Sequence, residues 1–129
     1  TRAYVQRAVA GVSYDVLWHR PGPGLPAMGN LLMHLRGTEH EWIGVKVGGL
    51  PRRRQRAVEF STDQEPGLQE LLMALASVQA ESDRVLAGLT TVDEHVTVCI
   101  HYTENHYAFH AGQLCLLRRL AEPAFQLYP

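Results

Sequence analysis

Two histidines spaced four residues apart, His106 and His110, are the side chains of this sequence best placed to do chemistry. The segment around them is typical of a helix, on which residues four apart share one face with their Cβ atoms about 5–6 Å apart. At that spacing a single helix can offer two imidazole nitrogens to one metal ion. The chain has seven histidines in 129 residues, a high proportion that favours metal or acid–base chemistry.

A third histidine, His34, lies within the apolar run formed by Leu31, Leu32 and Leu35. A histidine in an apolar stripe is costly unless both ring nitrogens are satisfied, so His34 alone would be interpreted as a hydrogen-bonded core residue. The same plain interpretation stays open for the other two histidines. Three such residues on two helices nevertheless predict a metal site, because helical bundles build these sites from inward-facing side chains.

Three imidazoles leave one or more coordination positions open to water or substrate, which is typical of a catalytic rather than a structural site. The ligand set suits zinc, nickel, iron, manganese or copper. The residues between the pair are Tyr-Ala-Phe, so the Glu of the HExxH zinc proteases is missing, and no GxSxG, P-loop or GxGxxG occurs. A hydrolytic or transfer reaction would therefore depend on an ion that lowers the pKa of bound water or a bound thiol.

Three further residues are candidates for a role beside the metal, each with a plainer alternative. Glu41 and Glu104 are carboxylates that could act as a base or support a ligand, although both are also typical of a surface. Gln113 follows His110 by three residues and can reach a ligand, a metal-bound water or a neighbouring helix. Glu41 and Gln113 are therefore the candidate catalytic residues.

A cluster of arginines lies in the polar connection over residues 51–65. It is either an ordinary solvated loop or a lip that holds an anionic cosubstrate over a nearby pocket. For the second alternative the candidate cofactor-binding residues are Arg52, Arg54 and Arg56. The remaining histidines fall off the predicted metal stripes and are expected to face solvent or to cap helices: His19, His40, His95 and His101.

Four helices are expected to position these residues. Apolar residues recur at three- and four-residue steps over residues 3–16, 27–47, 66–89 and 101–120. Residues 62–65 resemble a capping box with Pro66 at the helix start. Residues 92–100 alternate as a short strand would, but a single strand has no partner, so an irregular lead-in to the last helix is predicted. The predicted fold class is all-α, a four-helix bundle.

The composition indicates one domain over residues 1–129, with 46% apolar and 19% charged residues. No apolar run approaches the roughly 18 residues that would cross a bilayer. A net charge of −1 argues against nucleic acid as the main partner. Cys99 and Cys115 lack CxxC spacing and are expected to be reduced, which favours a cytoplasmic protein.

Three segments follow one another in an order that matches a known pattern. Trp18-His19-Arg20-Pro21 precedes a Pro/Gly loop; residues 29–43 contain LL-x-HL followed by E-x-x-W; and residues 106–118 read H-x-x-x-H-x-GQ-x-x-LLR. On these motifs the chain resembles the DinB-like (YfiT-like) superfamily of small helical metalloproteins over nearly its whole length. It departs from the family pattern in being short, with a clipped first helix.

The resemblance implies a four-helix bundle in which His34, His106 and His110 hold a divalent metal, with zinc or nickel the first expectation and iron or manganese further alternatives. It also implies frequent homodimers and thiol-dependent chemistry, with a low-molecular-weight thiol as cosubstrate. The expected function is thus a metal-dependent enzyme acting on a small molecule, as a thiol-linked transferase or a hydrolase. The alternative is a non-catalytic metal-binding or stress-related helical bundle.

Overall fold

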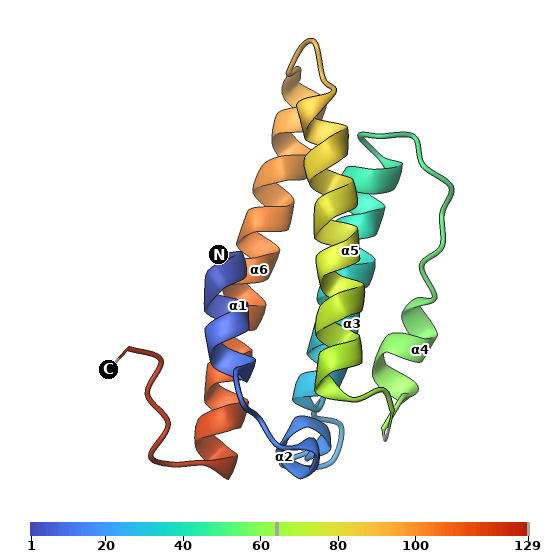
Figure 1. Ribbon diagram of the computed structural model, residues 1–129. Helices are drawn as coiled ribbons and strands as arrows, with labels where there is room; N and C mark the ends of the chain where they lie inside the picture. The colour runs from blue at the N-terminus through green and yellow to red at the C-terminus, as the bar shows by residue number, and fades with distance from the viewer. Residues whose placement is uncertain (64, 129) are drawn as a thin grey trace.

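The computed structural model describes residues 1–63 and 65–128, and over these residues the chain is all-helical, which confirms the predicted fold class at that level (Figure 1). The helices in chain order are α1 (Arg2–Val9), α2 (Tyr14–Trp18), α3 (Met28–Glu39), the π-helix η1 (His40–Val45), α4 (Arg56–Ser61), α5 (Leu68–Ala87) and α6 (Glu94–Ala121). No helix in the described part of the chain is both long enough and apolar enough to cross a membrane.

Helix α3 is the central element of this helical bundle. It contacts α2, α4, α5 and α6, while α1 lies along α6 on the other side (Figure 1). Because neighbours surround it, α3 is buried on almost every side, including at polar positions. The core contains apolar side chains from α1, α2, α3, α5 and α6, among them Val5, Leu17, Leu31, Leu32, Leu35, Leu75 and Leu114.

The helix predicted over residues 3–16 is wrong in its middle, because the chain forms two helices there. Gly11 adopts φ +66, a left-handed conformation that ends α1 and that residues with a side chain rarely adopt. Ser13 then starts α2 by accepting a hydrogen bond from the Val16 N–H at 3.3 Å. This turn brings Trp18 onto α3.

The helix predicted over residues 27–47 begins as expected but changes type part-way. The Asn30 side chain accepts a hydrogen bond from the Ala27 N–H at 2.9 Å, which satisfies one free donor at the start of α3. From His40 onward the backbone bonds run five residues back, as in the 3.1 Å bond from Lys46 N–H to the Glu41 carbonyl. The side chains after Glu39 therefore point in directions that 3.6-residue spacing does not predict.

Two boundaries in the second half of the chain also differ from expectation. The capping box predicted at residues 62–65 is wrong, since α5 follows Gly67 and begins at Leu68 without a side-chain cap; Gln64 lies outside the described residues. The irregular lead-in predicted over residues 92–100 is wrong as well. Asp93 accepts from the Val96 N–H at 2.9 Å and starts α6 at Glu94, seven residues earlier than predicted.

The contact between α2 and α3 depends on a glycine and gives a direct test of the packing. A Cβ atom on Gly29 would lie 2.6 Å from the Trp18 ring, and that ring is buried and donates to the Pro66 carbonyl. We expect Gly29→Ala to lower the free energy of unfolding by about 1–3 kcal/mol through overpacking. Urea denaturation would measure the difference.

Gly112→Ala is the matched control, because Gly112 also lies within a helix but a Cβ there meets nothing within 4 Å. That substitution should leave stability unchanged or raise it by up to about 1 kcal/mol. Equal effects of the two substitutions would contradict the described packing of Trp18.

Candidate metal centre

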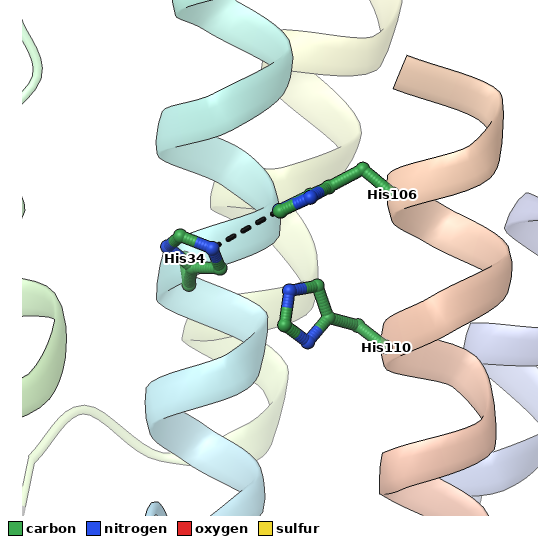
Figure 2. Close-up of side chains that lie close together, drawn as sticks. All are labelled: His34, His106 and His110. Carbon is green, nitrogen blue, oxygen red and sulfur yellow. Dashed lines mark hydrogen bonds between the residues drawn. The ribbon is translucent and has the colours of Figure 1, made fainter. Parts of the chain in front are cut away.

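The three predicted ligands come from two neighbouring helices and meet at one point (Figure 2). His34 projects from α3, and His106 and His110 project from successive turns of α6, all toward one another. One ligand nitrogen from each lies within 4.8 Å of the other two, and the ring centroids are 4.4–4.9 Å apart. His34 and His110 are both 7% exposed, so the cluster lies just beneath the surface.

A carboxylate fixes the orientation of the His34 ring. His34 Nδ1 lies 2.8 Å from Glu59 Oε2, and Glu59 is only 4% exposed. Arg54 Nη2 also approaches the same ring nitrogen, at 3.1 Å, but a guanidinium can only donate. The shorter contact decides the assignment: Nδ1–H donates to Glu59, which leaves the Nε2 lone pair facing the other histidines.

The His110 ring is fixed in the same manner from its own helix. His110 Nδ1 donates to Gln113 Oε1 at 2.6 Å, so its Nε2 also presents a lone pair to the cluster. Gln113 therefore orients a candidate ligand, and its amide oxygen is engaged in the hydrogen bond from the His110 ring. Partners of this kind, which hold the second nitrogen of a metal-binding histidine, are a regular feature of metal sites.

His106 faces His34 directly, with the two Nε2 atoms 3.0 Å apart (Figure 2). Burial lowers the pKa of His106 to about 4, with further contributions from His110 and His34. Burial also lowers the pKa of His110. These shifts favour the neutral imidazole, which is the form that binds a metal.

The residues fit a divalent ion. Tetrahedral coordination with metal–nitrogen distances of about 2.0–2.1 Å places ligand nitrogens about 3.3 Å apart, close to the spacing of the His34 and His106 nitrogens. Two of the three rings already direct a lone pair inward through their second-nitrogen partners. The cluster could hold a metal ion with positions left for water or another ligand, and the donor set alone does not select the element.

The structure separates the two predicted carboxylates from the histidine cluster. Glu41 accepts from Arg52 Nη2 at 2.6 Å, and Glu104 is exposed and lies 3.7 Å from His101. Neither carboxylate makes a hydrogen bond or ion pair to the three histidines within the described part of the chain. Glu41 therefore pairs with the arginine segment, and its candidate catalytic role stays a prediction.

The predicted arginine cluster is divided among separate ion pairs. Arg52 pairs with Glu41, Arg53 with Glu81 at 2.7 Å, and Arg54 with Glu59 at 2.7 Å. Among the arginines of residues 51–65, only Arg54 approaches the metal centre, where it contacts both Glu59 and His34. Arg56 is an exposed residue at the start of α4. Arg52, Arg54 and Arg56 therefore do not share one carboxylate partner, and the predicted anion-holding role of these arginines stays a prediction.

Three of the remaining histidines lie on the surface as predicted, namely His19, His95 and His101. The prediction for His40 is wrong, since it is 4% exposed and bonds Glu81 at 2.8 Å and the Pro51 carbonyl at 3.1 Å. His40 does point away from His34, but that side of the helix is covered by α5. Its burial follows from the central place of α3 in the bundle.

Glu59 is the residue of this site that the sequence prediction missed. It lay in a connection interpreted as polar loop, whereas residues 56–61 form a helix that packs on α3. Gly37 permits the approach, because a Cβ there would lie 2.1 Å from Glu59 Oε1. A glycine three residues after His34 was the one available sign that another chain segment comes close at this point.

The comparisons with known proteins identify no relative. No protein-family model matches the chain, and neither a curated protein nor a solved structure matches it. The candidate site therefore depends on the geometry of the histidine cluster and its supporting residues.

The bond between His34 and Glu59 predicts a measurable effect on metal affinity. In Glu59→Gln the neutral amide accepts more weakly and the His34 ring loses a charged partner, so we expect Zn²⁺ or Ni²⁺ to bind about 10–100-fold more weakly. Calorimetric titration of metal-free protein would measure this. Glu41→Gln removes the same charge away from the cluster and should change affinity by less than about threefold; equal losses in both variants would argue against the assigned role of Glu59.

The low pKa of His106 predicts that the metal-free protein loses stability in mild acid. A histidine in an unfolded chain protonates near about pH 6.5, whereas folded His106 does so only near 4. Between these values the unfolded state binds more protons, so the free energy of unfolding should fall as the pH drops from about 6.5 to about 4. Urea denaturation across this range, with NMR titration of the His106 ring, measures both quantities. The loss should be smaller in His106→Gln, and an unchanged loss would assign the effect to other groups.

Proposed function

We propose that this protein is a divalent-metal protein of the DinB-like type, with the ion held by His34, His106 and His110. We propose further that it is an enzyme, a thiol-linked transferase or a hydrolase acting on a small molecule in the cytoplasm. Zinc or nickel is the first choice of metal, with iron or manganese as alternatives. The bound ion would lower the pKa of a coordinated water or thiol.

One observation carries the proposal: two helices bring three imidazoles together, and acceptors on His34 and His110 leave their Nε2 lone pairs facing the same point. A histidine in the core needs a hydrogen-bond partner for each ring nitrogen. It does not need two other histidines at the spacing of metal ligands. Because the ligand group found among the described residues consists of these three histidines, coordination positions would remain for a substrate.

Aromatic side chains surround the cluster on its exposed side. Phe60 packs on His34, Tyr102 stacks on His106, and Phe109 meets His110 edge-on, with centroid distances of 4.9, 5.6 and 5.1 Å. All three are at least 37% exposed, so they present apolar surface beside the open coordination positions. This surface favours a substrate with an apolar portion, held where it would exclude water.

A second candidate function is a metal-binding protein without catalysis. It is favoured by the hydrogen bonding of Glu59, the carboxylate that contacts the cluster. Glu59 is tied to His34 and receives two hydrogen bonds from Arg54, which together lower its pKa although burial opposes them. A carboxylate held this way orients a ligand well but is a poor proton acceptor.

The two candidate functions can be separated in one series of measurements. Metal-stripped protein should bind one equivalent of Zn²⁺ or Ni²⁺, and His106→Ala should weaken that binding by more than about 100-fold, beyond the loss typical of a supporting residue. His101→Ala is the control, because His101 is exposed and lies on the same helix outside the cluster. Metal-loaded protein would then be tested with low-molecular-weight thiols and a panel of electrophiles and esters.

Thiol binding and turnover that both require the metal would support the enzyme. Tight metal binding that raises the melting temperature, with neither thiol binding nor turnover, would support the second candidate instead. Failure of the wild-type protein to bind any of these ions more tightly than His106→Ala would overturn both.

A further inference from the structure

A cavity lies next to the candidate metal centre, on the side of Glu59, and is enclosed by α3, α5 and residues 53–59. Its volume is about 480 Å³, within the range of small-molecule sites. None of the three clustered histidines lines it. Arg54 and Glu59 form the wall between the two sites, because they line the cavity and also contact His34.

Positive charge predominates in this cavity. Arg36, Arg53 and Arg54 line it, and the carboxylates that face these guanidiniums are Glu59 and Glu81. Arg54 donates to both Glu59 carboxylate oxygens through Nε and Nη2, and Arg53 reaches Glu81 through Nη2 alone. The Arg36 guanidinium has no hydrogen-bond or ion-pair partner among residues 1–63 and 65–128. The Arg36 guanidinium and part of the Arg53 guanidinium therefore remain for a ligand.

The remaining wall combines apolar and polar groups. Met33 of α3, Val58 of α4, and Ala74 and Val78 of α5 supply apolar surface, and His40, Gln55 and Ser77 supply polar groups. A cavity of this size with both cationic and apolar groups suits a molecule with one negative group and a short hydrocarbon part. An inorganic ion would leave the apolar wall unused.

We propose that this cavity binds a small organic anion, with its carboxylate or phosphate between Arg36 and Arg53 and its apolar part against Met33 and Val78. Guanidinium groups are well suited to both anions because their N–H donors match pairs of oxygens. The site is separate from the metal centre and does not depend on a bound ion, so this inference stands or falls independently of the proposed function.

The test uses the whole protein, stripped of metal with a chelator and also loaded with Zn²⁺. Butyrate and phenyl phosphate are the probes, inorganic phosphate tests the need for an apolar part, and n-butanol tests the need for charge. Amide NMR spectra and calorimetry report binding. We expect one organic anion to bind in both metal states, with shifts at Ala74, Ser77 and Val78 that exceed those at residues 106–110.

Arg36→Gln and Arg53→Gln should each weaken the tighter probe by about tenfold or more, since each removes a charged hydrogen bond. Both side chains reach the surface, so the variants are expected to fold, and circular dichroism would check this. Arg84→Gln is the matched control, an exposed arginine of α5 outside the cavity, and should change affinity less than twofold.

Several results would overturn the inference. One is that neither organic anion binds, and another is an equal loss of affinity in the Arg36 and Arg84 variants. A third is binding that disappears when the metal is removed, which would show that the anion binds to the metal ion. Binding of inorganic phosphate as tight as that of phenyl phosphate, or of n-butanol as tight as that of butyrate, would show that the apolar wall or the charge is not used.

Discussion

The hydrogen bond between His34 and Glu59 is the interaction on which the described site depends. It joins the central helix α3 to a short helix that would otherwise be a surface segment, and Gly37 leaves the space for it. Arg54 forms an ion pair with the same carboxylate and balances its charge. Burying a carboxylate without such partners would cost free energy, so the burial of Glu59 depends on both His34 and Arg54. Their arrangement sets the orientation of His34 and thereby the position of the cluster.

Other buried polar side chains of α3 and η1 also receive partners from other elements, although the buried Thr38 hydroxyl has none among the described residues. Asn30 donates to the carbonyls of Glu59 and Thr62, and His40 bonds Glu81 of α5. Glu39 is fully buried between Arg2 of α1 and the Tyr107 hydroxyl of α6, and burial together with this carboxylate raises the pKa of Tyr107. These bonds require particular neighbours, so they fix which helices surround α3 more narrowly than apolar packing would.

The sequence predicted the all-helical class and the two segments that carry the histidines, because apolar spacing reports which face of a helix is buried. It placed His34, His106 and His110 on inward-facing stripes, where the structure has them. It could not predict Glu59, since that residue acts across 25 positions from His34 and periodicity is a local signal. The burial of His40 was missed for a related reason: residue spacing gives the direction of a side chain but not what covers it.

The arginine segment shows how a run of like charges can be misjudged from sequence alone. Residues 52–54 follow one another, yet each pairs with a carboxylate from a different element: η1, α5 and α4. Pairing of this kind holds an extended segment against the bundle. It also places three neighbouring charges in three different environments. The Arg54 pair alone is largely buried, with side chains 13% and 6% exposed, so water screens it least. That pair forms the wall between the candidate metal centre and the cavity, so the two proposed sites lie on either side of one buried ion pair.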